Sequence, residues 1–289
     1  MKSNCPICNK PLTQKMRAKD YVVSNEIFDL LKCDSCDLLC TDINPDQYLS
    51  RYYESPEYHS HVQTASGLVS SLYRLVKKHT LKTKRKLINS ESDKPGSILD
   101  IGCGIGDFLL TMQKAGWDIT GSEPSEKARK QAETKLGQTI NSDLKSINAK
   151  FDVITLWHVL EHIPDLTETL NEIIGILETN GTLIIAVPNY RSYDARYYGE
   201  HWAGLDVPRH LWHFSQKTLS QLTQSKNLRI IKKVPMYFDS FYVSMLSEKY
   251  IKGSITFIGY VRALAVGIFS NIAASFTGNY SSLIYIIRK

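Results

Sequence analysis

Short apolar runs and helical patterns alternate along most of the chain. Ile98, Leu99 and Ile101 form a run typical of a buried parallel strand, and an apolar helical pattern begins at Phe108. Further strands are predicted at 117–121, 138–141, 151–156, 182–187, 228–234 and 281–288. Helices are predicted at 166–178, ended by Asn180 and Gly181, and at 216–226, capped by Ser215. This alternation predicts an α/β fold.

A glycine-rich turn follows the first of these strands. Asp100 precedes Gly102, Gly104 and Gly106, which let the backbone turn tightly and approach a ligand. A dinucleotide-binding turn has the spacing G-x-G-x-x-G and seats a pyrophosphate, whereas a carboxylate before the glycines repels phosphate and attracts a cation. The D-x-G-x-G-x-G pattern resembles motif I of the class I S-adenosylmethionine (SAM) dependent methyltransferases. The resemblance implies a Rossmann-like seven-stranded sheet with helices on both faces, and SAM as the cofactor.

Further cofactor-binding residues follow the later strands. Glu123 comes after the second strand, where Rossmann-type sheets bind ribose hydroxyls. Asp143 follows the third strand, and the resemblance places it beside the adenine. The segment from Trp157 to Asp165 resembles the motif that follows the fourth strand in quinone O-methyltransferases. This resemblance assigns Trp157 and His158 to the cofactor site.

The same segment carries a candidate metal site. His158, Glu161 and His162 stand at positions i, i+3 and i+4, which share one face of a helical turn. Some quinone methyltransferases hold a divalent metal on an E-x-x-E-H version of this face, and here His158 replaces the first Glu. A second divalent metal at Glu161 and His162 therefore competes with a role in which both side chains only brace the loop by hydrogen bonds. The metalloprotease signature H-x-x-E-H belongs to the interior of a long helix, and this segment follows a strand.

A long loop, residues 191–215, leaves the carboxyl end of the fifth strand, where ligands bind in open α/β sheets. The resemblance makes it the loop that binds the methyl acceptor. Its candidate substrate-binding residues are Tyr198, Trp202, Arg209, His210 and Trp212. Because His accepts a proton near neutral pH, the candidate bases are His210, His158 and His213, in that order.

The N-terminal residues carry two C-x-x-C pairs, Cys5 with Cys8 and Cys33 with Cys36, separated by 24 residues. Four thiolates at this spacing predict a closed, structural zinc site of ribbon type, with strands at 21–23 and 27–30. Four unconnected thiols are the alternative, and Cys40 is expected to be a spare buried thiol. Three domains follow: a zinc-ribbon module at 1–45, a helical connecting segment at 46–94 and a methyltransferase domain at 95–289.

The connecting segment combines aromatic and basic side chains. Its aromatic cluster, either packing or a lid over the cofactor, comprises Tyr52, Tyr53, Tyr58, His59 and His61. The predicted helix 68–88 carries seven basic residues between Arg74 and Lys86. No aromatic residues interleave with them, so a solvated face is favoured over an RNA-binding surface.

The segment 236–278 is predicted to be a helical insertion before the last strand. Residues 254–276 are long enough to cross a bilayer, but Arg262 and Asn271 near the middle argue against a span. Contact with a membrane surface or with a lipid-like substrate remains an alternative.

Composition adds a mild constraint. The net charge of +6 permits an anionic substrate or a nucleic acid but demands neither. No signal peptide is evident, so a cytoplasmic location is expected. The leading hypothesis is methyl transfer from SAM to an oxygen or carbon of a small molecule, such as a glycan or secondary-metabolite precursor or a lipid-like phenol. The alternatives are an RNA methyltransferase that uses the ribbon and helix 74–86, and a non-catalytic interaction protein with this fold.

Overall fold

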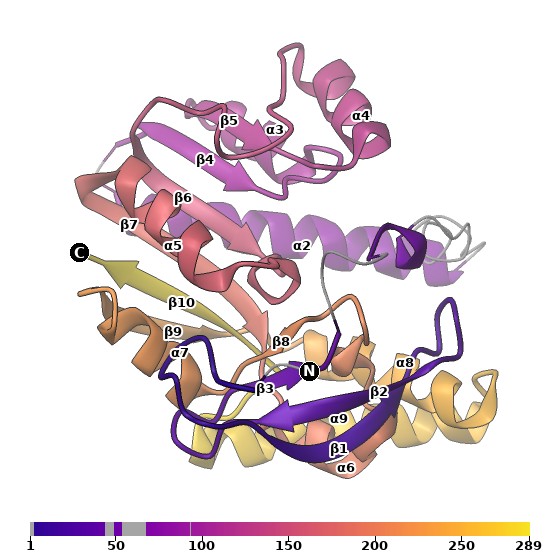
Figure 1. The fold of residues 1–289 in the computed structure, drawn as a ribbon. Helices are drawn as coiled ribbons and strands as arrows, with labels where there is room; N and C mark the ends of the chain where they lie inside the picture. The colour runs from indigo at the N-terminus through magenta and orange to yellow at the C-terminus, as the bar shows by residue number, and fades with distance from the viewer. Residues whose placement is uncertain (1–2, 44–48, 54–67, 93) are drawn as a thin grey trace. The chain divides into compact units, whose positions relative to one another are not determined.

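The structure is a computed structural model that describes residues 3–43, 49–53, 68–92 and 94–289 (Figure 1). The chain forms two compact units. The first comprises residues 1–58, 160–167 and 186–285, and the second comprises residues 59–159, 168–185 and 286–289. Of the expected aromatic cluster, Tyr58, His59 and His61 lie outside the described residues.

The second unit holds the parallel strands that the apolar runs predict. These are β4 (Ser97–Ile101), β5 (Asp118–Ser122) and β6 (Phe151–Trp157), and β4 lies between the other two. Helices α2 (Leu68–Ser90), α3 (Asp107–Gln113) and α4 (Glu126–Leu136) belong to the same unit (Figure 1). The register sets Asp100 beside Gly121 of β5 and Thr155 of β6, so the last polar residue of β4 meets the one hydroxyl of β6.

Helix α5 (Leu166–Ile176) precedes β7 (Leu177–Pro188), and β9 (Arg229–Pro235) and β10 (Ser282–Arg288) complete a six-stranded sheet. The strand order β5-β4-β6-β7-β10-β9 confirms the expected α/β fold. The predicted strand 138–141 is reduced to one bridge between Ser122 and Asn141. The side-chain amide of Gln138 donates to the carbonyl of Ile119 at 2.9 Å. This side chain therefore takes the place of a backbone N–H that would pair with the Ile119 carbonyl in a longer strand.

The stop predicted at Asn180 and Gly181 is wrong. Strand β7 already begins at Leu177 and runs through both residues. Neither residue has the positive φ of a helix-ending position, so the glycine extends a strand and does not cap a helix.

The first unit contains an antiparallel sheet in the order β1-β2-β3-β8. Its strands are β1 (Thr13–Lys19), β2 (Ile27–Lys32), β3 (Leu39–Thr41) and β8 (Trp212–His213). The predicted strand 21–23 is instead a turn. The Asp20 carboxylate accepts the backbone N–H groups of Val22, Val23 and Ser24 at 2.8–3.2 Å and so fixes that turn.

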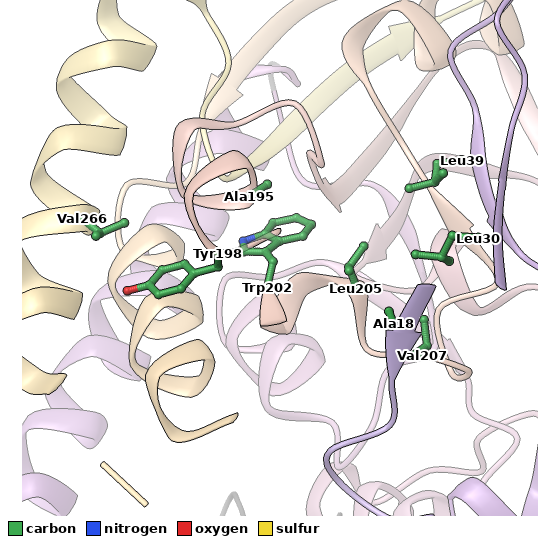
Figure 2. Packing of buried hydrophobic residues seen from close by; sticks show 9 residues of the cluster. All are labelled: Ala18, Leu30, Leu39, Ala195, Tyr198, Trp202, Leu205, Val207 and Val266. Atoms are coloured by element: carbon green, nitrogen blue, oxygen red, sulfur yellow. The ribbon is translucent and has the colours of Figure 1, made fainter. Parts of the chain in front are cut away.

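The loop expected at 191–215 contains three short helices, α6 (Tyr193–Tyr198), η3 (Gly199–His201) and η4 (Ala203–Leu205). Residues of this segment pack in one core with Ala18, Leu30 and Leu39 of the antiparallel sheet (Figure 2). Val266 of α9 (Phe257–Thr277) belongs to the same core (Figure 2). The segment therefore forms part of the framework of the first unit.

The remaining described helices are η1 (Leu49–Tyr52), η2 (Leu160–His162), α7 (Gln216–Gln224), α8 (Asp239–Lys252) and α9 (Phe257–Thr277). Among the described residues, α9 is long and apolar enough to cross a membrane by length and composition alone.

Candidate active site and metal centre

The three glycines of the turn all adopt left-handed backbone conformations, with φ of 66°, 54° and 78° at Gly102, Gly104 and Gly106. A Cβ added to Gly102 would lie 2.6 Å from Val159 Cγ2, so this glycine is required by packing. A Cβ on Gly104 would meet no atom within 4 Å among the described residues. The space over Gly104 is therefore open to a ligand that approaches the backbone.

Asp100 lies at the end of β4 with its side chain buried. Thr155 Oγ1 donates a hydrogen bond of 2.6 Å to its carboxylate, as the register of β4 and β6 requires. Burial raises the pKa of Asp100 to about 7, although the Thr155 hydroxyl and the Lys84 charge both act to lower it. A cationic ligand would complete the stabilisation of the ionised form.

Glu123 links the end of β5 to the glycine turn. One carboxylate oxygen accepts the Gly104 N–H at 2.9 Å, and the other accepts the Ser125 N–H at 2.8 Å. Each oxygen keeps a lone pair for a further donor, which suits the two hydroxyls of a ribose. Open space, a buried acid and a positioned carboxylate together fit SAM.

Trp157 ends β6, and its indole nitrogen is buried with no hydrogen-bond partner among the described residues. Lys84 of α2 places its ammonium 4.1 Å from the centroid of the Trp157 ring, and its charge acts to lower the pKa of Asp100. Thr155 and Lys84 are site residues that sequence reasoning missed. A single Thr in the apolar run 153–157 was the available signal for Thr155, whereas Lys84 was indistinguishable from its basic neighbours.

His158 has a φ of 56°, which a right-handed helix does not contain. His158, Glu161 and His162 therefore do not share one helical face, contrary to expectation. Asp143 is exposed, and its carboxylate accepts the Ser142 hydroxyl and the Ser146 N–H at 3.0 Å each. These bonds lower the pKa of Asp143 and hold a local turn.

Two histidines and a buried acid meet in the first unit. One ligand atom from each of Glu161, His162 and His210 lies within 4.8 Å of the others, and no other described residues besides the cysteines form such a group. The two imidazole rings meet edge to face with centres 4.6 Å apart. Only Glu161 and His162 of this cluster were assigned together from sequence, because His210 lies on a distant segment.

The hydrogen bonds indicate the tautomers of both imidazoles. His162 Nδ1 lies 3.0 Å from the carbonyl of Arg209, and His210 Nδ1 lies 2.9 Å from the carbonyl of Gly204. A carbonyl can only accept, so each Nδ1 carries the proton and each Nε2 offers a lone pair. Burial lowers the pKa of His162 to about 4, which keeps that ring neutral. The cluster can accept a proton or bind a cation.

His213 has a structural position. The Thr41 hydroxyl donates to the His210 carbonyl at 2.7 Å, so the His213 Nε2, 3.1 Å from the same hydroxyl, must donate to it. His213 Nε2 is therefore a donor and not a base in this structure, and its bond fixes the ring against Thr41 of β3.

Three other expected substrate-binding side chains are internal and hydrogen-bonded within the first unit. Tyr198 donates to Glu248 at 3.1 Å, Trp202 to Asp194 at 2.8 Å, and Trp212 to the carbonyl of Ile163 at 2.6 Å. All three rings are buried.

Arg209 is fully enclosed between two carboxylates, Asp20 at 3.0 Å and Asp206 at 2.6 Å. The Arg209 charge lowers the pKa of both acids against the effect of burial. This ion pair fastens the turn after β1 to the segment before β8. It leaves the guanidinium no exposed surface for a substrate.

The four cysteines form two matching knuckles. Each first cysteine donates its N–H to a carbonyl five residues on and accepts an N–H from four residues on, where Asn9 and Asp37 have positive φ. The Sγ atoms of Cys5 and Cys36 are 3.3 Å apart, and those of Cys8 and Cys33 are 3.4 Å apart. Tetrahedral zinc thiolates stand about 3.8 Å apart, so a small expansion would admit the ion. Cys40 instead donates to the carbonyl of Leu31 at 3.5 Å.

Comparison with protein families gives one match. The family described as "Methyltransferase domain" matches residues 72–233, which is more than half of the chain. A ubiquinone biosynthesis O-methyltransferase from Actinobacillus pleuropneumoniae serotype 7 is 36% identical over 107 residues, 32% of this chain and 45% of the relative. The one from Nitrosospira multiformis is 24% identical over 57% of this chain and 74% of the relative. The chain thus spans about half the length of the first of these relatives.

Among solved structures, the magnesium protoporphyrin IX methyltransferase from Synechocystis PCC 6803 with bound SAH has a TM-score of 0.54. It is 15% identical and covers 82% of this chain and 97% of its own. This likeness shows a shared fold.

Proposed function

The chain belongs to the methyltransferase domain family of class I SAM-dependent proteins, and we propose that it transfers a methyl group from SAM to a small molecule. The observation that carries the proposal is the open space over Gly104, whose N–H donates to the Glu123 carboxylate, together with the buried carboxylate of Asp100 at the end of β4. SAM supplies a methyl group on a sulfonium, which leaves as a neutral thioether when a nucleophile takes the methyl. Alignment therefore contributes more than acid–base chemistry.

The residues of the second unit have distinct roles in this proposal. Asp100 offers negative charge to the cationic methionine part, and Glu123 accepts the ribose hydroxyls. Gly104 lets the ligand approach the backbone, since any side chain would fill the space that the structure leaves open. Trp157 and Lys84 contact each other at the same end of the sheet, and the charge of Lys84 acts on Asp100.

The acceptor is a hydroxyl or an acidic C–H on a glycan precursor, a secondary-metabolite precursor or a lipid-like phenol. The names of the curated relatives favour oxygen. Such a nucleophile must lose a proton, and we assign His210 as the base that takes it. Its Nδ1 bonds to the Gly204 carbonyl, which leaves Nε2 as the nitrogen for the incoming proton, and Nε2 lies 4.0 Å from the Asp206 carboxylate. A nearby carboxylate stabilises the imidazolium that results.

Replacing His210 with Ala tests this role. We expect turnover to fall by about a hundredfold while SAM affinity stays unchanged. His201→Ala is the control, since His201 lies on the same segment outside the cluster and contacts the Tyr21 ring. An unchanged rate in His210→Ala would exclude His210 as the base.

The alternative proposal for the same cluster is that it binds a divalent cation. Two unprotonated Nε2 atoms and the Glu161 carboxylate form a two-histidine, one-carboxylate set. Titration of the metal-stripped protein with Mn²⁺ or Fe²⁺, followed by calorimetry, tests this occupant. Binding that Glu161→Gln abolishes would assign the cluster to a metal, and absence of binding leaves the proton role.

Zinc in the four-cysteine site is also part of the proposal. The paired knuckles and the close sulfur atoms support it, and four cysteines leave no open position for catalysis. The ion would therefore stabilise the fold of the N-terminal residues.

Label transfer tests the function as a whole. The protein is incubated with methyl-labelled SAM and a lysate from its source, and the products are separated by size and nuclease sensitivity. Label in a small, nuclease-resistant fraction supports the proposal. Label in a large, RNase-sensitive fraction favours the RNA alternative, and failure to bind SAM at all favours a non-catalytic interaction protein.

A further inference from the structure

Helix α9 buries its small side chains and exposes its large apolar ones. Its buried positions are mostly small: Gly259, Ala263, Val266, Gly267, Ser270 and Ala274. Its exposed positions carry the large apolar side chains Phe257, Ile258, Val261, Leu264, Ile268, Phe269, Ile272 and Phe276. A surface helix of a water-soluble domain shows the opposite arrangement, with its large apolar side chains toward the core.

Helix α8 repeats the arrangement. Its buried face consists of Ser240, Ser244, Ser247 and the paired Glu248. The N-cap residue Phe238 and the exposed Tyr242 and Met245 of α8 are spaced at four and three residues, and this exposed face continues with Lys249 and Lys252. Both helices thus expose apolar side chains and join through small or polar ones.

The two helices form an antiparallel hairpin. The Asn271 amide donates to the carbonyl of Tyr237 at 3.0 Å near one end, and Arg262 donates to Glu248 at 2.6 Å near the other. Gly267 permits this approach, since a Cβ there would lie 2.5 Å from the Phe241 ring. Small residues at the joint and large residues outside are typical of helices that pack in lipid.

Hydrogen bonds connect the hairpin to the rest of the first unit. Ser270 donates to the buried Asp194 at 2.6 Å, and Tyr198 of α6 donates to Glu248 at 3.1 Å. Crossing a bilayer would break these bonds and bury the Arg262–Glu248 ion pair in hydrocarbon, which is costly. The apolar face is about 30 Å long for 21 residues, so it can lie along a membrane surface without crossing it.

The charge of this region selects the kind of surface. The charged residues of the hairpin, 238–277, are Asp239, Glu248, Lys249, Lys252 and Arg262, a net charge of +1. Arg262 and Glu248 pair with each other, so the positive charge of the exposed face comes from Lys249 and Lys252, which are both exposed on α8. A second copy of the chain would bring the same positive charge to the same face, whereas anionic lipid headgroups complement it.

We propose that the α8–α9 hairpin docks on an anionic lipid membrane, with the exposed apolar face of α9 in the headgroup region and the lysines at the phosphates. The apolar positions supply the burial, and the lysines supply the preference for negative lipid. This binding is separate from methyl transfer and needs neither SAM nor an acceptor.

Flotation of the full chain with vesicles tests the proposal. We compare vesicles of phosphatidylcholine alone with vesicles of phosphatidylcholine and phosphatidylglycerol. The protein is expected to float with the anionic vesicles, and Lys249→Glu with Lys252→Glu is expected to weaken this binding. Weakening by added salt is expected for the same reason.

A triple variant, Phe257→Ser, Phe269→Ser and Phe276→Ser, removes rings that are 82%, 58% and 86% exposed. We expect membrane affinity to fall by about tenfold or more with little change in melting temperature. Ile27→Ser is the matched control, since Ile27 is 67% exposed on β2 and outside the hairpin.

Three results would overturn the proposal. The first is that the chain fails to float with anionic vesicles, and the second is that the triple variant floats as well as the native chain. The third is a dimer in sedimentation velocity without lipid that the triple variant converts to a monomer, because this result would assign the face to a second copy.

Discussion

At the scale of single residues, Gly102 and Gly104 show how two similar positions differ in function. Both have positive φ, but only Gly102 faces a packed side chain, and Gly104 faces open space. The sequence pattern predicts that both are glycine. It does not tell which one is required by the fold and which by the ligand.

Gly104→Ala is expected to weaken SAM binding by about tenfold or more, because the new methyl group occupies space that a ligand uses. The cost in folding free energy should be only about 1 kcal/mol, since the strain comes from positive φ alone. Calorimetry and thermal unfolding measure the two effects. Gly137→Ala is the matched control, with φ of 70° and no atom near its added Cβ, and it should show the strain without the loss of binding. Equal SAM affinity in both variants would exclude Gly104 from the cofactor site.

The raised pKa of Asp100 predicts that the free energy of unfolding and the affinity for SAM change with pH in opposite directions. Burial raises its pKa to about 7, so the folded chain holds a proton between about pH 4 and 7 that the unfolded chain releases. The free energy of unfolding should therefore decrease as pH rises through that window, by up to about 1.4 kcal/mol per pH unit from this group, and level off above it. SAM affinity should rise over the same range, because a cation favours the ionised form. Asp100→Asn should remove both dependences, measured by urea unfolding and calorimetry.

In the segment 191–215, residue types indicated which side chains can bind or transfer a proton, but not which of them are buried in the core. His210 was selected from sequence and lies in the cluster with His162 and Glu161. Trp202 and Arg209 were selected on the same grounds and are buried in hydrogen bonds and ion pairs. Aromatic and cationic side chains serve both cores and binding sites, and only tertiary packing separates the two uses.

At the scale of elements, the strands with continuous apolar runs were predicted well, and the short segments were not. The run 98–101 needs burial on both faces, which only a central parallel strand provides. The residues 21–23 are as apolar as many strands, yet one preceding carboxylate, Asp20, holds them in a turn. Local side-chain bonds of this kind compete with strand formation and are weakly visible in sequence.

The two cysteine knuckles predict that zinc supports the fold of the N-terminal residues. We expect about one zinc per chain by elemental analysis, and we expect a strong chelator to lower the melting temperature. Cys33→Ser should lose the metal and show the lower melting temperature without chelator. Cys40→Ser is the control, because its thiol bonds to the carbonyl of Leu31 and lies outside the four-cysteine group. Full metal content in Cys33→Ser would contradict the assignment.

At the scale of the whole molecule, helix α2 decides between a small acceptor and RNA. Lys77 contacts Asp107 at 2.5 Å, and Lys84 lies over Trp157, so two of its cations serve contacts within the second unit. Lys78, Lys82 and Lys86 are exposed and recur at intervals of four along the helix. Any electrostatic footprint for a phosphate backbone on α2 would depend on such exposed cations.

Replacing Lys78, Lys82 and Lys86 with Glu changes the charge of this face by six units without touching the buried contacts. For a small acceptor we expect label transfer within about twofold of the native rate, since surface charge chiefly affects encounter with large polyanions. For RNA the same variant should lose most of its activity, and the native enzyme should lose activity steeply with added salt. A native chain whose rate is insensitive to both changes acts on a small molecule. Loss of transfer in the variant, together with RNase-sensitive label, would move the substrate to RNA and give the basic helix its function.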